Sequence, residues 1–541
     1  MSRHSRSSVL LALTALVGFR LLYGLSMPFW FEDERQVYLI GLQSFAHQEW
    51  PYFGADVVWT GGRLPGALLG WLIRLPLAIW PAPEAPFILL NVLSGASLSL
   101  LAWYIGRRLP RLPRWLIWTT LFTLPWTLNF STHIVNPSFA LAGAIVFFVG
   151  FFESMPSLRR GILSVALAWS MMGFGLLWVM QLHLSWVLLL PYALAAVLWS
   201  SRGGTRVAVP IAAFLAGAAL PGVLLIPTLT AYGWDAGHGQ GAVTFHWLSP
   251  LEVITMTARV LSFASFEITR FMGLSTAERA FAILRSPLIG AAAMPVLVAG
   301  LVHPLWMAAS AFRRSPDAAA DWTAVRALFA GTILLIFVSY FYSIRGPQAH
   351  AFSVVFPVAA LFAFTCWDAR VSPASRLMPR IALVVIVSNI VLHAALGLDR
   401  LSRQSLYADR TLVAAAITDR NDRYLGERRG AGQEIRATDD LQLVQQTWRP
   451  WRGFSRFDLT IRNTSQTTAW LDIRLATTYL DQTGMTVASR EVVVKQILEP
   501  GESRTWTDIA DDRVPEFAVS AALRIVAAER VAPTQRRDGE R

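Results

Sequence analysis

Apolar stretches that could cross a bilayer recur along the first three quarters of the chain and then stop. Each is close to the roughly 20 residues that a helix needs to cross the hydrocarbon core of a membrane. The pattern predicts about eleven transmembrane helices and therefore a polytopic α-helical membrane protein. The predicted spans are 9–27, 86–106, 115–130, 139–153, 162–180, 184–200, 207–227, 288–311, 327–342, 353–368 and 381–397.

The pattern changes after residue 398, where charged residues appear every few positions. Residues 457–461, 471–475 and 521–526 alternate between apolar and polar side chains, as half-buried strands do. We therefore predict a small all-β sandwich after the membrane part. The predicted organisation is a membrane domain at 1–398, a helical connector at 399–434, the sandwich at 435–531 and a disordered tail at 532–541.

Composition supports a membrane protein and argues against a nucleic-acid-binding one. The chain is 54% hydrophobic and 15% charged, whereas soluble domains carry about 25% charged residues. The net charge of +12 comes almost entirely from arginines in short loops between predicted spans, so membrane topology accounts for it. The single cysteine, Cys366, lies in an apolar stretch, which excludes disulfides within the chain and thiolate metal clusters.

The arginines predict the orientation. They gather in alternate loops, for example at 107–114, 159–160 and 370–380, and such loops face the cytoplasm. The N-terminus is then cytoplasmic, and an odd number of spans places the C-terminal domain outside. Arg3 and Arg6 precede the first apolar stretch, but no small-residue cleavage site follows it, so we expect an uncleaved first span.

Acidic residues follow the opposite pattern and indicate where function lies. Ten of the 14 acidic residues before position 399 fall in predicted outer loops. Two of these outer segments, 28–85 and 228–287, are too long for simple connections and contain amphipathic patterns. We expect helices there that lie in the membrane interface.

Three consecutive carboxylates, Glu32, Asp33 and Glu34, follow the first span directly. Such a cluster beside a membrane is costly unless its members are paired or used. The same residues could also begin a solvated helix, because acids complement the N-terminal end of the helix dipole. The cluster by itself leaves both interpretations open.

A wider set of motifs surrounds this cluster. Asp33-Glu34 is followed by a tryptophan and proline at 50–51 and by Gly61-Gly62-Arg63-Leu64-Pro65, and a later segment, 342–350, contains a Pro and His/Tyr loop. This arrangement resembles the GT-C superfamily of membrane glycosyltransferases, in particular the protein O-mannosyltransferase and lipid A aminoarabinose transferase branch. The strand pattern around 463–501 in turn resembles the FxLYD type of immunoglobulin-like sandwich.

The resemblance implies an inverting transfer of a sugar from a polyprenyl-phosphate donor to a lipid, glycan or protein acceptor, outside a bacterial cytoplasmic membrane. It implies that Asp33 is the general base, with Glu32 as the alternative if the register is shifted by one. Glu34 would orient the acceptor or a divalent cation such as Mg, Mn or Zn. Arg63 and Arg345 would hold the donor phosphate. An acid of the aminoarabinose branch is missing next to Arg63, which leaves the metal and the sugar open.

Five further residues are weaker candidates. Arg20 lies inside the first span, where it could snorkel to the outer interface or pair with carboxylates or a lipid phosphate. His133 could belong to a helix cap or contact substrate. Tyr342, His350 and Asp56 are candidate substrate contacts. The glycine-rich segment 232–241 predicts a flexible loop or a lid, and the spacing of its aspartate and histidine does not identify a metal site.

Two other classes of function remain as alternatives. A transporter or flippase of lipid-linked material predicts internal repeats, interrupted helices and charged residues at the midplane. Apart from Arg20 the predicted spans lack charge, and no repeat is evident. A noncatalytic membrane assembly protein would leave the outer carboxylates without a use.

Overall fold

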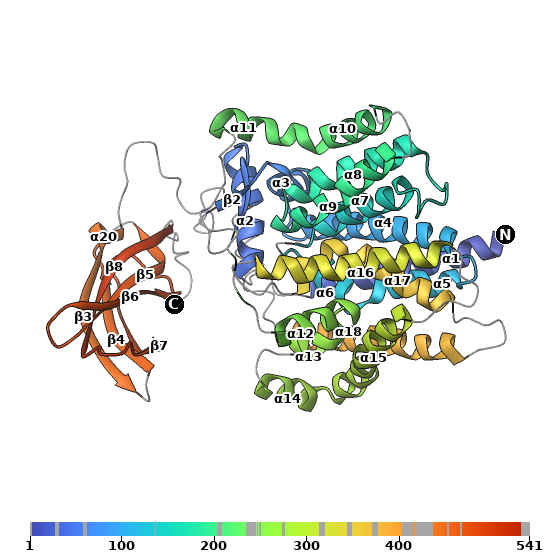
Figure 1. The fold of residues 1–541 in the computed structure, drawn as a ribbon. Helices are drawn as coiled ribbons and strands as arrows, with labels where there is room; N and C mark the ends of the chain where they lie inside the picture. Colours follow the sequence, from blue (N-terminus) through green and yellow to red (C-terminus); the bar gives the residue numbers. More distant parts are fainter. Residues whose placement is uncertain are drawn as a thin grey trace. The chain divides into compact units, whose positions relative to one another are not determined.

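The structure is a computed structural model that forms two compact units, Met1–Arg410 and Thr411–Arg541 (Figure 1). The described residues are 3–26, 32–57, 62–135, 137–202, 208–233, 245, 247, 250–272, 276–312, 320–342, 349–369, 377–402, 414, 417, 437–451, 454–465 and 468–531.

The first unit is a bundle of long apolar helices that lie side by side (Figure 1). Every predicted span coincides with a helix or with consecutive helical segments. These are α1 (Arg3–Leu25), α4 (Ala85–Arg108), α5 (Arg114–Thr123), α6 (Pro125–Ser131), α7 (Ala140–Ser154), α8 (Val165–Met180), η1 (Leu184–Leu189), α9 (Leu190–Arg202), α10 (Ala208–Gly222), η2 (Val223–Leu225), α11 (Ile226–Tyr232), α15 (Pro287–Phe312), α16 (Ala320–Phe341), η4 (Ala349–Val355), α17 (Phe356–Asp368) and α18 (Leu377–Ser402). Among the described residues, six helical segments are long and apolar enough to cross a membrane, and five shorter apolar helices accompany them. The predicted polytopic helical membrane fold is confirmed.

One predicted span, 115–130, is interrupted rather than continuous. α5 ends at Thr123 and α6 begins at Pro125, with Leu124 between them in an extended conformation (φ −54°, ψ 140°). Proline lacks an N–H and its ring excludes the carbonyl four residues before it, so the helical hydrogen bonds cannot continue through this point. The break frees backbone carbonyls inside the bundle, and these need partners from elsewhere in the chain.

Glycines allow the closest helix crossings. A Cβ atom built on Gly173 of α8 would lie 1.9 Å from the carbonyl oxygen of Phe214 in α10, and one built on Gly217 of α10 would lie 1.9 Å from the carbonyl oxygen of Ser170. The two backbones therefore touch where neither residue has a side chain. Such small-residue contacts replace the hydrophobic driving force that helices lack inside a lipid bilayer.

The first long outer segment contains the two expected helices, α2 (Glu32–His47) and α3 (Leu68–Ile79), and a hairpin that the sequence did not predict. The hairpin consists of β1 (Phe53–Val57) and β2 (Gly62–Pro65) in antiparallel register. It docks on the end of α10 and α11: the Thr228 hydroxyl donates to the Tyr52 carbonyl at 2.6 Å, and the Tyr232 ring lies 5.3 Å from the ring of Tyr52.

The second long outer segment is also helical, as expected. It contains α12 (Pro250–Leu261), η3 (Ser265–Glu267), α13 (Ile268–Met272) and α14 (Thr276–Arg285). The histidines and the aspartate of its glycine-rich region, Asp235, His238 and His246, lie outside the described residues.

The second unit is strand-rich, as predicted. A short helix, α20 (Ala437–Asp440), precedes β3 (Leu441–Trp451), β4 (Phe454–Asn463), β5 (Ala469–Leu480), β6 (Thr486–Val494), β7 (Ser503–Arg513) and β8 (Ser520–Val531). The strands form two antiparallel sheets, ordered β3-β4-β7 and β6-β5-β8. Buried residues of both sheets, including Leu459 and Ile473, share one core, so the predicted sandwich is present. The predicted connector lies mostly outside the described residues, and the predicted tail lies entirely outside them.

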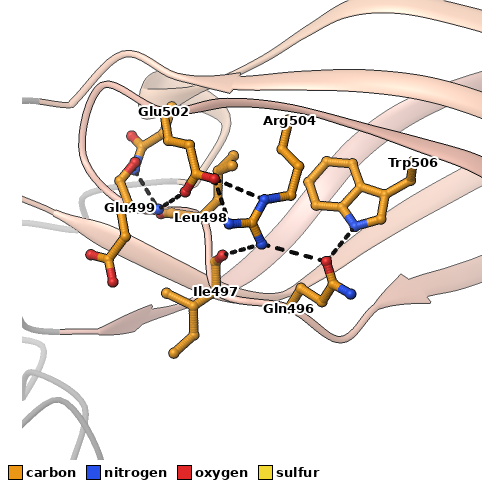
Figure 2. Close-up of polar contacts among 8 residues, drawn as sticks. Gln496, Ile497, Leu498, Glu499, Glu502, Arg504 and Trp506 are labelled. Carbon is orange, nitrogen blue, oxygen red and sulfur yellow. Dashed lines mark hydrogen bonds and ion pairs between the residues drawn. The ribbon is translucent and has the colours of Figure 1, made fainter.

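Two polar clusters stabilise the turns of the sandwich. Buried Asn463 donates to the carbonyls of Thr468, Leu498 and Glu499 at 2.7, 3.1 and 3.1 Å. Figure 2 shows the second cluster, in which Arg504 contacts Glu502 at 2.8 Å and the Trp506 indole donates to Gln496 at 2.9 Å. Arg504 also donates to the Ile497 carbonyl at 3.2 Å, so both clusters hold backbone in place.

Candidate functional site

Segments predicted to face outward meet at one end of the helix bundle. The Asn91 amide, near the start of α4, donates to the Thr132 carbonyl at 2.7 Å, and Arg400, near the end of α18, contacts the Tyr23 hydroxyl of α1 at 3.4 Å. The opposite end holds a buried acid, Glu153, which accepts a hydrogen bond from Tyr104 at 2.9 Å. The loops thus sort into two ends as the arginine pattern requires, while the orientation of those ends in the membrane stays a prediction.

A buried polar cluster occupies the predicted outer end. It consists of Tyr23, Asn129, Asn389, His393 and Arg400, and we call it the Tyr23 cluster. The Tyr23 hydroxyl donates to Asn129 Oδ1 at 2.6 Å, Asn129 Nδ2 lies 3.1 Å from His393 Nε2, and Asn389 Nδ2 donates to the Thr123 carbonyl. Because polar groups are costly inside a membrane, a hydrogen-bonded network of this size marks a defined centre in the bundle.

Sequence analysis missed most of this cluster, although a signal was present. Asn389, His393 and Arg400 are spaced by four and seven residues, which places them on one face of α18. They lie within or just after an apolar run that was assigned to membrane crossing alone. A polar stripe at helical spacing inside a predicted span is the pattern that would have identified them.

His133 lies next to this cluster, in the connection between α6 and α7. Desolvation of the ring, together with the positive charge of Arg400, lowers the pKa of His133 to about 3. The imidazole is therefore neutral at physiological pH. A neutral ring cannot supply charge to a phosphate, so a role for His133 toward substrate would be limited to hydrogen bonding or packing.

Arg20 requires a correction. It is 1% exposed and does not snorkel to the interface. Its guanidinium donates to the Phe122 carbonyl at 2.9 Å, the Ser131 hydroxyl at 2.9 Å and the Thr127 carbonyl at 3.3 Å. These groups flank the break between α5 and α6. Arg20 therefore stabilises an interrupted span, and we withdraw it as a donor-phosphate ligand.

The three carboxylates lie in the first turn of α2, the helix that follows α1. Their side chains are outside the described residues, so only the position of the turn is known. α2 begins seven residues after the end of α1, which limits the separation to roughly 25 Å. Tyr38 fixes the helix farther along, because its buried hydroxyl donates to the Pro83 carbonyl at 3.0 Å, just before α4. Burial, with Glu84 nearby, raises the pKa of Tyr38.

The hairpin brings two of the candidate residues together. Asp56 of β1 and Arg63 of β2 are paired in the antiparallel register. Arg63 is exposed, and the side chain of Asp56 is outside the described residues. An acidic residue and an arginine therefore occupy opposed backbone positions of the hairpin.

The motif tryptophans before and after the hairpin also meet. The indole rings of Trp50 and Trp71 lie 5.5 Å apart, and Arg74 lies 4.8 Å above the Trp71 ring while donating to the Glu49 carbonyl at 2.8 Å. These contacts hold α3 against the residues that follow α2. The motifs that suggested the family thus build a small folded unit at the predicted outer end.

The remaining candidates do not assemble into a described site. Tyr342 directly follows α16 with 49% of its surface exposed, and its ring lies 5.6 Å from Phe245. His350 lies in η4, with its side chain outside the described residues, and Arg345 lies entirely outside them. Among the described residues, no group of three or more His, Cys, Asp or Glu could hold a metal ion. The divalent cation therefore stays a prediction.

An apolar pocket of about 310 Å³ lies between α5, α15, α17 and α18. Its lining includes Met378 and Asn389 of α18, which are 11 residues apart, so the pocket extends roughly 16 Å along that helix. His303 also lines it, with both ring nitrogens in contact with protein: Nδ1 with the Leu261 carbonyl at 3.2 Å and Nε2 with the Trp367 indole at 3.3 Å. Because Asn389 belongs to both, the pocket adjoins the Tyr23 cluster.

Structural comparison gives matches over most of the chain. Crystal structures of ArnT from Cupriavidus metallidurans match in the apo state, at 12% identity and a TM-score of 0.47, and bound to undecaprenyl phosphate, at 13% identity and a TM-score of 0.43. The chain is similar to ArnT. The match to apo ArnT covers 75% of this chain and 78% of the ArnT chain, and the match to the lipid-bound ArnT covers 77% and 78%. No protein-family model and no curated protein sequence matches the chain.

Proposed function

We propose that this protein is a membrane glycosyltransferase that moves a sugar from a polyprenyl-phosphate donor to an acceptor, with inversion, outside a bacterial cytoplasmic membrane. The observation that carries the proposal is the apolar pocket that adjoins the Tyr23 cluster. The Tyr23 cluster lies at the end of the bundle that holds the acidic first turn of α2 and the Asp56–Arg63 hairpin pair, and the pocket extends from Asn389 toward the opposite end. A lipid-linked substrate needs this combination of an intramembrane site for its chain and polar groups near the membrane surface.

The proposed chemistry needs few protein groups. The bond between the sugar C1 and the phosphate oxygen breaks, and its electron pair leaves with the phosphate. The acceptor oxygen bonds to C1 from the opposite face, while its proton passes to Asp33. Phosphate is a good leaving group, so one positioned carboxylate can serve as the general base. Glu32 is the alternative base, and Glu34 would orient the acceptor or a cation.

Arginines would hold the departing phosphate. Arg63 and Arg345 are the proposed ligands, because guanidinium keeps its proton and donates two parallel hydrogen bonds to phosphate. Arg400 adds a third cation at the same end, contacting the Tyr23 hydroxyl at 3.4 Å and the Phe271 carbonyl at 3.2 Å. The acceptor would be a lipid, a glycan or a protein.

Substitution of the acidic turn tests the proposal. Proteoliposomes that contain the full chain would receive a panel of radiolabelled undecaprenyl-phosphate sugars and an envelope extract as acceptor. We expect Asp33→Asn to lower transfer at least ~100-fold, the minimum usual effect of losing a general base. Glu32→Gln should retain most activity, and Glu252→Gln on exposed α12 is the matched control. Full activity in both Asp33→Asn and Glu32→Gln would overturn the mechanism.

The interrupted third span is the one feature that favours a transporter. Interrupted helices often surround transported substrates, and residues 114–131 are divided at Leu124. The freed carbonyls, however, contact Arg20 and Asn389 rather than an aqueous path. Reconstituted protein should therefore not move a fluorescent lipid-linked sugar across vesicles, and ATP-independent flipping at rates above empty vesicles would favour the transporter.

A further inference from the structure

The hydrogen bonds of the Tyr23 cluster have a fixed direction, which begins at the ring of His393. Nδ1 of this ring lies 2.8 Å from the carbonyl of Asn389, one turn earlier on α18. A carbonyl only accepts hydrogen bonds, so Nδ1 carries the proton. Nε2 faces Asn129 Nδ2 at 3.1 Å, and an amide nitrogen only donates. Nε2 is therefore the acceptor, and the ring is neutral.

The side-chain amide of Asn129 continues this direction. Asn129 Nδ2 also donates to the Pro125 carbonyl at 2.8 Å, so a second acceptor identifies this end of the amide as the nitrogen. Asn129 Oδ1 faces the Tyr23 hydroxyl at 2.6 Å and accepts its proton. The Tyr23 oxygen then has only lone pairs left, and it can form a further hydrogen bond only with a donor.

Arg400 is that donor. Its Nη1 lies 3.4 Å from the Tyr23 oxygen, and its Cζ lies 5.7 Å from the centre of the Tyr23 ring. Nη2 of the same guanidinium donates to the Phe271 carbonyl at 3.2 Å. The groups form a series in which each donates to the next, and we call it the Tyr23 relay: Arg400, Tyr23, Asn129, His393 and the Asn389 carbonyl. The relay starts and ends on α18, so one helix fixes both of its ends.

Burial distinguishes Arg400 from the other side chains of the relay. Tyr23, Asn129 and His393 are 3%, 1% and 0% exposed, whereas Arg400 is partly exposed. Hydrogen bonds in a chain polarise one another, and in a buried environment they are stronger than in water. Because the Tyr23 hydroxyl donates its own proton inward, its lone pairs are directed at the guanidinium. The buried groups thereby restrict a long side chain that would otherwise populate many rotamers.

We propose that Tyr23 is a positioning residue, which acts through the Tyr23 relay to hold the Arg400 guanidinium in the orientation that binds a lipid phosphate. Tyr23 itself does not touch the ligand. The phosphate as the ligand of Arg400 rests on the proposed function, whereas the relay follows from the hydrogen-bond directions alone. Loss of the Tyr23 hydroxyl should therefore weaken binding of the phosphate and leave binding of the hydrocarbon chain unchanged.

The first test is equilibrium binding to the full chain in phosphatidylcholine nanodiscs. The probes are tritium-labelled undecaprenyl phosphate and undecaprenol, which share one hydrocarbon chain. Wild type should bind the phosphate more tightly, and Arg400→Gln should lose at least ~10-fold of the phosphate affinity. Tyr23→Phe removes only the hydroxyl and should weaken phosphate binding about 2- to 10-fold, the range that immobilising one long side chain represents. Neither variant should change the affinity for undecaprenol.

A double-mutant cycle separates positioning from a direct contact. Because Tyr23 acts through Arg400, Tyr23→Phe should have no further effect on phosphate binding in the Arg400→Gln background. The matched control is Tyr192→Phe on α9, which removes another buried tyrosine hydroxyl, one that donates to Thr332 at 2.7 Å. Tyr192→Phe should leave the phosphate affinity unchanged, even where it lowers the unfolding temperature as much as Tyr23→Phe does.

The second test examines the relay in the wild-type protein, so it does not depend on how a Tyr23 variant folds. Nitrogen NMR of the full chain with isotope-labelled histidine should show His393 as a neutral ring that carries its proton on Nδ1. The His393 signals are identified by their loss in His393→Gln. A proton on Nε2 could not coexist with the hydrogen bond from Asn129 Nδ2, and its detection would overturn the proposal.

Three results of the binding test count against the role of Tyr23. Unchanged phosphate affinity in Tyr23→Phe would show that Arg400 needs no relay. A loss that persists in the Arg400→Gln background would show that the hydroxyl acts on the ligand or on the fold instead. A wild type without preference for the phosphate would overturn the proposed donor site together with this role. A preference that needs Arg400 but not Tyr23 would remove only the role of Tyr23. Since no transfer is measured, failure of the Asp33 mechanism leaves the test unaffected.

Discussion

Arg20 on α1 donates a hydrogen bond at 2.9 Å to the hydroxyl of Ser131 on α6. Ser131 follows the break that divides the third span. A guanidinium presents five donors in a plane, so one side chain can reach the Phe122 carbonyl before Pro125 and the Thr127 carbonyl after it. The break between α5 and α6 therefore explains why an arginine is buried inside the first predicted span.

Arg20→Met should unfold the membrane unit rather than weaken donor binding. It leaves the Phe122 carbonyl without its partner, at about 1 to 3 kcal/mol for an unsatisfied buried group. It also removes one donor from the Thr127 carbonyl, which still accepts from the Ser131 hydroxyl. We expect a lower unfolding temperature and aggregation in size-exclusion chromatography. Arg107→Met, at an exposed position of α4, is the control and should differ little from wild type. A well-folded Arg20→Met protein that had lost only donor affinity would restore the phosphate-binding role.

Gly217→Ala should disrupt the crossing of α8 and α10. Its new methyl group would lie 1.9 Å from the Ser170 carbonyl oxygen, so the helices must separate. Overpacking of this kind costs about 1 to 3 kcal/mol, measurable as a shift in thermal unfolding. Gly331→Ala on α16 is the matched control: nothing lies within 4 Å of its new Cβ, and it should be neutral or slightly stabilising. Equal effects of the two substitutions would contradict the predicted close crossing.

His133→Gln should reduce the sensitivity of the fold to acid. The pKa of His133 is lowered to about 3 in the folded protein, whereas the unfolded chain binds this proton near pH 6.5. The free energy of unfolding therefore falls as the pH decreases from 6.5 toward 3. Above pH 6.5 His133 is neutral in both states and does not make stability depend on pH. The difference between the unfolding temperatures at pH 7.5 and at pH 5 should be smaller in His133→Gln than in wild type. His183→Gln is the control, and an unchanged pH slope in His133→Gln would disprove the assignment.

Asn463→Leu should destabilise the sandwich without affecting the helices. The buried amide donates to three carbonyls. Those of Leu498 and Glu499 also accept from backbone N–H groups, so its removal costs about 1 to 3 kcal/mol, chiefly at the Thr468 carbonyl. Limited proteolysis of the full chain should release the C-terminal unit faster than in wild type. Gln482→Leu, in the exposed turn between β5 and β6, should leave the rate unchanged. If the two variants were cleaved equally fast, the amide would not be the element that holds these turns.

The sequence was sufficient for what depends on local pattern. Apolar runs of adequate length predicted every span, and alternation predicted three of the six described strands of the sandwich, β4, β5 and β8. It was insufficient where long-range contacts decide the structure. The hairpin around Asp56 and Arg63 has too few alternating positions to be recognised, and its register is determined by docking on α11. The partners of Arg20 and of Arg400 lie in helices distant along the chain, so the apolar pattern carried no sign of them.

Long-range contacts also decide which site residues the sequence could not reveal. Asp56 and Arg63 were listed for different roles, and only the pairing of β1 with β2 shows them opposite each other. Asn389 and His393 were passed over because their neighbours are apolar.

The burial of Arg20 also constrains how the protein is made. Its acceptors in α5 and α6 lie 102 to 111 residues later in the chain, so they are synthesised after the first span has already met the membrane. At translation rates of roughly 5 to 20 residues per second, about 5 to 20 s separate the two events. During that interval a positive charge must remain in contact with water or with the insertion machinery. The first helix can therefore enter the lipid completely only in the company of the third, and biogenesis proceeds by release of an assembled group of helices.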